Sequence, residues 1–392
     1  MGLIHNLSES EISVIVPGRV MSTPIYITGC QTPKYLIDIV DLDVPNEEVG
    51  LAVVEQGKET DWVFCTHEGR VSLATDFKHR RLLIVSIDIH NSVSSVESIK
   101  SQLIAIKFAL SHVKANKKVF IHINEENGVG FRKLLFEKQS KINGNIWVED
   151  SYLNKEENLV SRKLMFSGDR SLIQSEAVLE NGTINIVKSI NNVLYFKAII
   201  LGVKLALLDK ESDYDKTRSV LVIGGGANLL SVGIQRLVKN TSVTSVELDP
   251  VVAEAAQQCY NTENISTIIG DGIEIAKNNY SNCVVIDVDN KVNSDGIGAP
   301  PEIFISEDVI KMMKERLIGT NPFIVYNTVI RNEIAFKTVS SRIRKMFKRV
   351  YQWESESDLN VVFFCFVNDF DMKKDQDSLG DKQFCEELSE LC

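Results

Sequence analysis

Residues 219–250 read SVLVIGGGANLLSVGIQRLVKNTSVTSVELDP, and this stretch decides the fold. It predicts an apolar strand, a turn at Gly224–Gly226, an amphipathic helix and a second strand that ends at Glu247. Glycine allows the backbone to turn sharply and leaves room for a ligand at the N-terminus of the following helix. Glu247 lies 21 positions after Gly226, and an acid about 20 residues beyond such a turn commonly binds ribose hydroxyls. The stretch therefore predicts a site for a nucleoside-bearing cofactor.

Composition excludes several classes of protein. The 392 residues suffice for two domains, and the net charge of −10 argues against a nucleic-acid partner, which requires a basic surface. No apolar run approaches the about 20 residues that cross a bilayer, and the N-terminus does not resemble a signal peptide. The seven cysteines form no CxxC pair and no metal-ligand spacing. We therefore expect a cytoplasmic protein with no membrane attachment and no metal site.

The alternation of apolar runs and helical periodicity predicts an α/β fold. Strands and helices alternate from the glycine turn to Val367, which is typical of a doubly wound, Rossmann-like sheet. We expect four regions: an accessory α/β region at 1–160, a β-hairpin and lead-in helix at 161–215, the cofactor domain at 216–368, and a mobile acidic tail at 369–392. Strand-like runs in the accessory region include residues 12–16 and 62–64.

Further polar residues follow successive predicted strands of the cofactor domain. Asp271 and Gly272 follow the third strand, where an acid can accept a hydrogen bond from an adenine amino group. Asp287 ends the fourth strand. Ligands of open α/β sheets bind at the carboxyl ends of the strands, so we expect these residues to surround the ligand. The predicted cofactor-binding residues are Gly224, Gly225, Gly226, Glu247, Asp271, Gly272 and Asp287.

Two observations favour S-adenosylmethionine over a dinucleotide. The dinucleotide fingerprint has a third glycine where this chain has Leu229. All six histidines precede the cofactor domain, whereas a dehydrogenase or hydrolase would commonly use one as a general base. Methyl transfer to an amine needs alignment and a neutral amine rather than a strong base. The order of glycine turn, acid, Asp-Gly and Asp resembles class I methyltransferases, and the triple glycine resembles their spermidine-synthase branch.

Several motifs, in order, resemble the methyltransferase-like 13 family, the lysine and N-terminal methyltransferases of translation elongation factor 1-alpha. The accessory region carries VVEQGKETDWVFCTHEGR at 53–70, and RKLMFSGDRSLIQSEAVL follows at 162–179. The cofactor domain carries VVIDVDNK at 284–291, PPEIFI after Ala299, and YNTVIR at 326–331. The resemblance covers most of this chain and only the C-terminal half of the family's proteins.

The resemblance implies a methyltransferase that modifies the N-terminal α-amino group of the elongation factor. Family members carry an N-terminal domain similar to lysine methyltransferases and a C-terminal domain that modifies the α-amino group. This chain has one glycine turn of that kind, so the resemblance implies only the second activity, with the N-terminal domain missing or the chain a shortened paralogue. Two departures affect substrate geometry: Ala299 replaces a cysteine, and Leu194, Tyr195 and Phe196 replace a histidine-rich stretch. The resemblance also implies that Gln174 closes over the cofactor, although a surface role for this hairpin is equally compatible with the residues.

The chemistry of an α-amine fits the residues after the fourth and fifth strands. An α-amino group has a pKa of about 7.7–8.0, so a weak base such as Asp287, Asp289 or water suffices. Asn327 has a side-chain carbonyl that could orient the amine lone pair. We predict Asp287 and Asn327 nearest the amine, with Asp289 and Asn290 next to them.

Two other functions stay open at this point. Spermidine synthases share the glycine turn and transfer an aminopropyl group, but they carry an acidic Asp-Ser-Ser-Asp-Pro loop where this chain has Asp287-Val288-Asp289-Asn290-Lys291. A non-catalytic scaffold that keeps the fold is the other alternative. The sequence is also compatible with a homodimer.

Overall fold

The chain folds into two compact units, and each is described by itself. The computed structural model describes residues 3–45, 48–91, 96–111, 119–122, 129–167, 169–207, 217–262, 264–290, 296–374 and 379–391. The first unit comprises residues 1–139 and 143–179, and the second comprises 140–142 and 180–392. The boundary near residue 180 falls inside the range 161–215 that was predicted to form a separate hairpin and lead-in helix. Residues 208–215 of the predicted hairpin and lead-in helix, and Lys291 of the loop compared with spermidine synthases, lie outside the described residues.

The first unit contains a six-stranded mixed sheet. Its order is β1-β2-β3-β5-β4-β6, with β4 parallel to both β5 and β6 and the other pairs antiparallel. The strands are β1 Leu3–Ile4, β2 Val20–Ile27, β3 Tyr35–Asp41, β4 Val49–Val53, β5 Arg81–Ile87 and β6 Val119–His122. The helices are α1 Glu9–Ser13, α2 Trp62–Cys65, α3 His67–Phe77 and α4 Val96–Ser111. The accessory region is therefore α/β, as predicted.

Two runs predicted as strands in this unit, 12–16 and 62–64, are not strands, and residues 14–16 belong to no helix or strand. Residues 12 and 13 close α1, because Ser8 and Glu11 form a capping box that favours helix at its start. Residues 62–64 lie in α2, which leads directly into α3. Short apolar runs are compatible with either structure, and in α1 the capping box decides for helix, whereas Asp61 before α2 makes no side-chain cap hydrogen bond.

A second sheet follows, in the order β11-β10-β9-β8-β7. Its strands are β7 Arg132–Ser140, β8 Gly144–Asn154, β9 Leu159–Phe166, β10 Asp169–Glu180 and β11 Thr183–Ile184. Asn181 and Gly182 form the turn between β10 and β11, and both residues have positive φ. β10 is irregular on either side of Ile173, where its register with β9 shifts.

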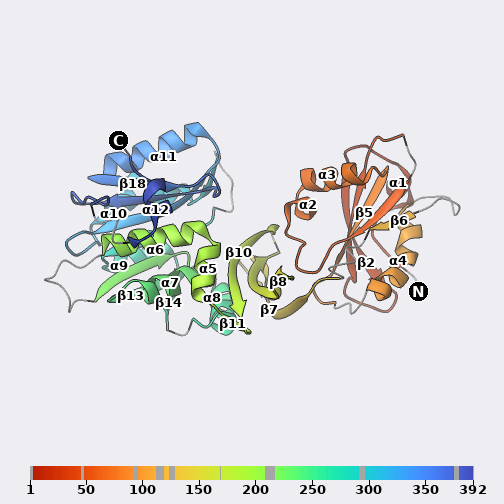
Figure 1. Cartoon of the computed structure of the whole chain (residues 1–392), viewed down its shortest axis with the longest axis horizontal. Helices are drawn as coiled ribbons and strands as arrows, with labels where there is room; N and C mark the ends of the chain where they lie inside the picture. Colours follow the sequence, from red (N-terminus) through yellow and green to blue (C-terminus); the bar gives the residue numbers. More distant parts are fainter. Residues whose placement is uncertain are drawn as a thin grey trace. The chain divides into compact units, whose positions relative to one another are not determined.

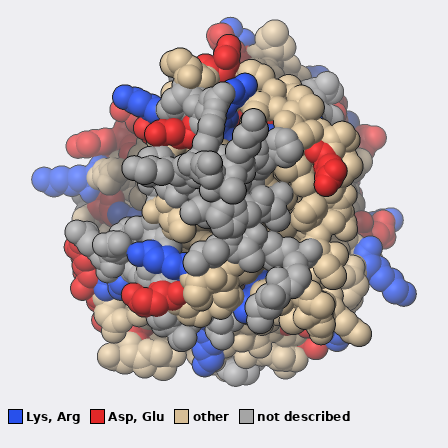
Figure 2. Space-filling view, turned by 90° about the vertical axis from the view of Figure 1, so that its right-hand side faces the viewer, with Lys and Arg blue, Asp and Glu red and all other residues tan. Residues whose placement is uncertain are grey.

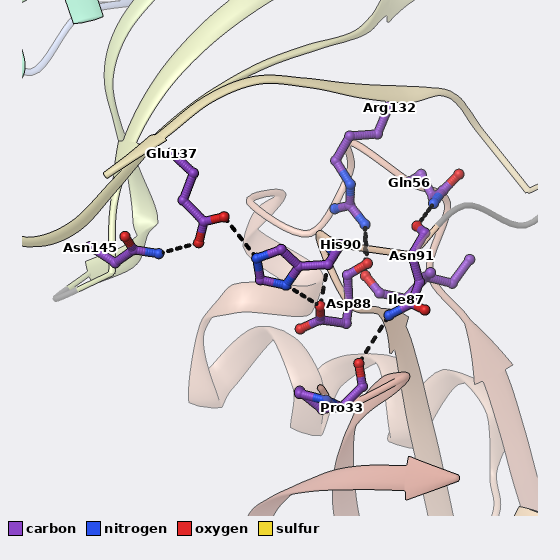
Figure 3. Close-up of polar contacts among 9 residues, drawn as sticks. All are labelled: Pro33, Gln56, Ile87, Asp88, His90, Asn91, Arg132, Glu137 and Asn145. Carbon is purple, nitrogen blue, oxygen red and sulfur yellow. Dashed lines mark hydrogen bonds and ion pairs between the residues drawn. The ribbon is translucent and has the colours of Figure 1, made fainter. Parts of the chain in front are cut away.

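His90 links the two sheets of the first unit (Figure 3). Its Nδ1 lies 2.8 Å from Asp88 Oδ1, just beyond β5, and its Nε2 lies 2.8 Å from Glu137 Oε2 on β7. Asn145 of β8 donates from Nδ2 to Glu137 Oε1 at 2.5 Å. Burial lowers the pKa of His90, but the hydrogen bonds to Glu137 and Asp88 outweigh it and raise the pKa above its usual value. A protonated His90 therefore ties together two carboxylates that come from different sheets.

The second unit, coloured from green to blue in Figure 1, is built on a nine-stranded sheet. Its order is β14-β13-β12-β15-β17-β19-β18-β20, with β16 paired to β17. Strands β12 to β15 and β17 are parallel, and β19 runs antiparallel between β17 and β18. The strands are β12 Arg218–Ile223, β13 Thr241–Glu247, β14 Ser266–Ile269, β15 Cys283–Ile286, β16 Ile297–Ala299, β17 Phe323–Ile330, β18 Arg349–Glu354, β19 Asn360–Phe366 and β20 Leu388–Glu390.

Helices cover both faces of this sheet. One face buries alternate strand residues such as Ile223, Ile286 and Tyr326 in a core shared with α9 Gly272–Asn278, α10 Glu307–Lys314 and α11 Glu333–Met346. On the other face, Gly202 of α6 lies directly against the Phe364 ring of β19. The remaining helices are α5 Ile186–Asn192, α6 Leu194–Ala206, α7 Leu229–Leu237, α8 Pro250–Cys259 and α12 Lys382–Glu387, with a short 3₁₀ turn at Glu302–Ile305. The sheet is doubly wound, as predicted.

The acidic tail is ordered where it is described, so the prediction that it is mobile is wrong for these residues. β20 pairs with β18 through Trp353 and Leu388, which extends the sheet. Lys197 of α6 forms a 2.7 Å ion pair with Asp381, and Phe384 is buried. The polar composition of the tail concealed these few apolar anchors.

One face of the molecule and the described helices bear on two features, a basic patch and a membrane span. Basic and acidic side chains are interspersed over the described part of the face seen in Figure 2. Among the described helices, no single one is long and apolar enough to cross a membrane, although the pair α5 and α6, bent by 110°, passes by length and composition together.

Candidate active site at the carboxyl ends of the strands

The glycine turn lies between β12 and α7 and is held by its neighbours. The backbone N–H groups of Gly224 and Gly225 donate to Val246 O at 3.0 and 2.9 Å. Gly224 has a φ of +95°, and a Cβ there would lie 2.0 Å from the backbone oxygen of Asp287. A Cβ on Gly225 would lie 2.6 Å from Ser245 Oγ. Side chains are therefore excluded from the turn by its own packing as well as by its conformation.

Glu247 ends β13 with both carboxylate oxygens on backbone donors. Gly226 N–H donates to Oε2 at 2.8 Å, and Asp249 N–H donates to Oε1 at 2.9 Å. Burial raises the pKa of Glu247, and the bonds from Asp249 and Gly226 only partly offset the rise. The predicted acid therefore lies against the glycine turn, where it also fixes the turn's conformation.

Side-chain hydrogen bonds made by Asn228, just after the turn, were not predicted from the sequence. Asn228 is buried with a φ of +59° at the N-cap of α7. Its Oδ1 accepts from Ser245 Oγ at 2.6 Å, and its Nδ2 donates to Thr267 Oγ1 at 3.1 Å. Asparagine two residues after the glycine turn was the available signal, because it tolerates the left-handed region better than most residues. Leu229 stands where the dinucleotide fingerprint has its third glycine. It begins α7 and its side chain is buried in the core.

Asp271 and Gly272 follow β14 at the same edge. Asp271 caps α9, since its Oδ1 accepts from the backbone N–H of Ile273 and Glu274 at 2.8 and 3.2 Å. Gly270 N–H donates to Glu247 O at 3.0 Å, which joins this loop to the end of β13. Asp271 therefore has an established capping role, and its contact with an adenine stays a prediction.

Two exposed apolar side chains flank these acids, and neither was singled out from the sequence. Leu248 is 54% exposed and Ile269 is 55% exposed. Glu247 is paired with Ile269 in the parallel register of β13 and β14, so both apolar side chains lie beside the acid. Such a pair can cover the faces of a flat base.

Asp287 follows β15 next to the glycine turn. Its backbone N–H donates to Ile223 O at 2.9 Å. Asn327 of β17 donates from Nδ2 to Asp287 Oδ1 at 2.7 Å, and Asn360 donates from Nδ2 to Asn327 Oδ1 at 2.8 Å. Burial raises the pKa of Asp287 to about 6, with a further rise from Asp289 and an opposing effect of the Asn327 bond. The carboxylate is thus a weak base whose pKa lies just below neutral pH.

The structure places the other two predicted catalytic residues differently. Asp289 is exposed, close enough to Asp287 to affect its pKa. Asn290 donates from Nδ2 to Ile297 O at 3.0 Å, and its backbone N–H donates to Gly298 O at 2.9 Å. Asn290 therefore anchors the loop to the β16 segment.

Tyr195 is a site residue that the sequence revealed only as a departure from the family pattern. It lies near the start of α6, packed edge-on against Phe196. Burial raises the pKa of its hydroxyl well above the usual value, and three carboxylates raise it further, those of Asp287, Asp358 and Asp289. The hydroxyl therefore belongs to the same cluster as Asp287.

Gln174 lies in the first unit, at the register shift of β10. Its closure over the cofactor stays a prediction.

These features define the class of domain. Strand order with an antiparallel β19 between β17 and β18, a glycine turn after β12, and acids after β13 and β15 together describe the class I methyltransferase fold. The predicted fold class is confirmed.

Comparisons with known proteins agree with the predicted resemblance. No family model matches the chain. The chain is similar to the "eEF1A lysine and N-terminal methyltransferase homolog" of Drosophila pseudoobscura (28% identical over 364 residues, 87% of this chain and 52% of the relative) and of Drosophila melanogaster (27% over 356 residues, 86% and 52%). It is similar to the zebrafish (Danio rerio) "eEF1A lysine and N-terminal methyltransferase" (25% over 374 residues, 85% and 54%). The chain spans about half the length of these curated relatives.

Solved structures with similarity to the chain include two of the expected kinds. Human methyltransferase-like protein 13 in complex with SAH aligns with a TM-score of 0.43 and 19% identity, over 48% of this chain and 91% of that one. Spermidine synthase of Thermotoga maritima aligns with a TM-score of 0.39 and 17% identity, over 62% of this chain and 75% of that one.

Proposed function

We propose that this chain is an S-adenosylmethionine-dependent N-methyltransferase that modifies the N-terminal α-amino group of translation elongation factor 1-alpha. The observation that carries the proposal is the position of Asp287, a half-buried weak base whose backbone contacts the glycine turn. The names of the curated relatives support a protein acceptor, since those names specify eEF1A as the protein that the relatives methylate. We further propose that the chain acts in the cytoplasm.

The residues at the strand ends fit this cofactor. The turn leaves no room for a Cβ at Gly224 or Gly225, which keeps backbone surface available at the N-terminus of α7. Glu247 offers carboxylate oxygens to ribose hydroxyls, and Leu248 and Ile269 offer apolar surface to the adenine. When bound, the cofactor supplies an electrophilic methyl group on a sulfonium sulfur.

The chain's own contribution to transfer is to hold an amine and take its proton. At neutral pH, roughly a tenth or more of an α-amine is already uncharged, against far less of a lysine amine with a pKa of about 10.4. The Asp287 carboxylate, with a pKa of about 6, is mostly ionised at pH 7 and attracts the cationic form of the amine. It then accepts the proton as the lone pair becomes available, so no histidine is required.

The two alternatives make different demands on the same loop. An aminopropyltransferase needs acidic side chains to hold a polyamine, whereas Asn290 bonds the backbone of β16 at the corresponding place. A scaffold would keep cofactor binding without transfer. The site geometry favours the methyltransferase because Asp287 retains a half-buried carboxylate that accepts a hydrogen bond from Asn327.

One experiment separates the three functions. The purified chain is incubated with methyl-labelled S-adenosylmethionine and elongation factor 1-alpha, and separately with decarboxylated S-adenosylmethionine and putrescine, with Asp287→Ala as the control. We expect label on the N-terminal peptide of the factor, no aminopropyl product, and loss of label in the control. Cofactor binding without transfer to the factor would refute the proposed activity.

A further inference from the structure

Two asparagines lie in series behind Asp287. Asn327, on β17, donates to the carboxylate, and Asn360, the first residue of β19, donates to the carbonyl oxygen of Asn327. The two distances, 2.7 and 2.8 Å, are those of well-formed hydrogen bonds. The antiparallel register of β17 and β19 pairs Asn360 with Val329, two residues along from Asn327, so the strands themselves hold the amides within reach.

The orientation of the Asn327 side-chain amide matters because its carbonyl oxygen only accepts hydrogen bonds and its NH₂ group only donates them. An ionised carboxylate only accepts hydrogen bonds, so it is compatible with the NH₂ end of Asn327 and repels its carbonyl end. Asn327 is 4% exposed, so water has little access to correct a reversed amide. Asn360 is itself anchored, since its backbone N–H donates to Asp358 Oδ1 at 3.0 Å.

We propose that Asn360 is a positioning residue that acts through Asn327: it holds the Asn327 amide with its NH₂ toward Asp287 and thereby keeps Asp287 an ionised acceptor for the amine. This assignment rests on the proposed function for its catalytic meaning. It also changes the role predicted for Asn327, whose carbonyl oxygen bonds Asn360 and whose NH₂ serves Asp287. Asn327 therefore orients the base.

The charges around Asp287 explain why such a donor is needed. Burial and the nearby Asp289 raise the pKa of Asp287, and the Asn327 bond is the effect that lowers it, leaving a pKa of about 6. Tyr195 and Asp358 are the other titratable groups of this cluster, and they supply no positive charge. Without a correctly oriented Asn327, the carboxyl would bind a proton near neutral pH and lose its affinity for a cationic amine.

The test uses two substitutions at Asn360 and a matched control in the full chain. Asn360→Leu removes the donor at similar size, and Asn360→Asp replaces it with an acceptor of the same shape. The control is Asn368→Leu, beyond the other end of β19, where Asn368 donates to Thr320 O at 2.9 Å. Circular dichroism verifies that each variant folds. If Asn360→Leu does not fold, the test is made with Asn360→Asp alone.

The first readout does not depend on transfer. The carboxyl carbon of Asp287 is titrated by ¹³C NMR in aspartate-labelled protein, with Asp287→Asn to assign the signal. We expect the midpoint to rise by about one pH unit in Asn360→Leu and by at least as much in Asn360→Asp, because a lost hydrogen bond to the charged form raises a carboxyl pKa. The control variant, Asn368→Leu, should leave the midpoint of the Asp287 titration unchanged. An unchanged midpoint in the Asn360 variants would overturn the proposal.

The second readout is the pH profile of methyl transfer. A rise of about one unit reduces the ionised fraction about threefold at pH 6.5 and hardly at all at pH 8.5, so the acid limb of kcat/KM should move upward with the rate at high pH retained. An equal loss of rate at every pH would mean that Asn360 is merely structural and would overturn the proposal. If the wild-type chain transfers no methyl group but the NMR midpoint moves as expected, the proposed function fails and the positioning of Asp287 by Asn360 stands.

Discussion

Gly224→Ala is the substitution for which the structure gives the most specific expectation. The residue has a φ of +95°, a conformation that costs a side-chain-bearing residue about 1–2 kcal/mol. The new Cβ would also lie 2.0 Å from the backbone oxygen of Asp287, so the two backbones must part by at least 1.0 Å to reach 3.0 Å, a separation below which real Cβ atoms essentially never occur. Overpacking of this kind costs about 1–3 kcal/mol more.

Gly182→Ala provides a matched control. Gly182 also has a positive φ, +76°, but nothing lies within 4 Å of its added Cβ. The control therefore bears the conformational cost without the clash. We expect Gly182→Ala to lower the free energy of unfolding by about 1 kcal/mol and Gly224→Ala to lower it by about 2–5 kcal/mol.

Urea unfolding and calorimetric titration with S-adenosylhomocysteine measure both effects. Gly224→Ala should also bind the ligand at least about tenfold more weakly, because the shift displaces Asp287 and the turn together. Gly182→Ala should bind as the wild type does. Equal losses of stability in the two variants, with unchanged ligand affinity in both, would refute two inferences: that the backbone of Asp287 leaves no room for a side chain at position 224, and that Gly224 lines the site.

Three further predictions concern other parts of the chain. Arg81 and Asp41 form a fully buried ion pair with a 2.6 Å Nε–Oδ1 contact, so Arg81→Met should cost about 3–5 kcal/mol in urea unfolding, and adding Asp41→Leu should recover only part of it, because Arg81 also donates to backbone oxygens such as that of Val14. The pKa of His90 is raised in the folded state, so the stability lost in His90→Gln should be largest below the unfolded pKa of about 6.5 and should vanish as the pH rises through the folded pKa; a constant difference in chemical unfolding across pH would contradict this. Leu248→Ser should weaken S-adenosylhomocysteine binding about tenfold through lost apolar contact, whereas Ile318→Ser, at the amino-end edge of the sheet, should not.

The sequence predicted the parallel core of the second unit because its signals are local. Apolar runs such as Val220–Ile223, glycine turns and helical periodicity are set by residues close together in the chain. The acids after β13 and β15 could be placed for the same reason, since a parallel sheet brings the carboxyl ends of its strands to one edge.

The features that escaped prediction depend on tertiary pairing. β18, with the sequence RVYQWE, and the three residues of β20 have no distinctive pattern until β19 pairs with β18. Asn360 looked like any polar residue before a strand, and only the register with β17 brings it to Asn327. Its role could not be predicted from local sequence because it depends on a contact 33 residues away.

The most direct test of the central claim compares acceptors that differ only at the α-amine. Peptides with the N-terminal sequence of elongation factor 1-alpha, with the α-amine free or acetylated, are incubated with the chain and S-adenosylmethionine, and fragmentation mass spectrometry locates each methyl group. The account predicts methylation of the α-nitrogen in the free peptide, none in the acetylated peptide, and none with Asp287→Asn. Methyl groups found only on lysine side chains, or on the acetylated peptide as readily as on the free one, would contradict it.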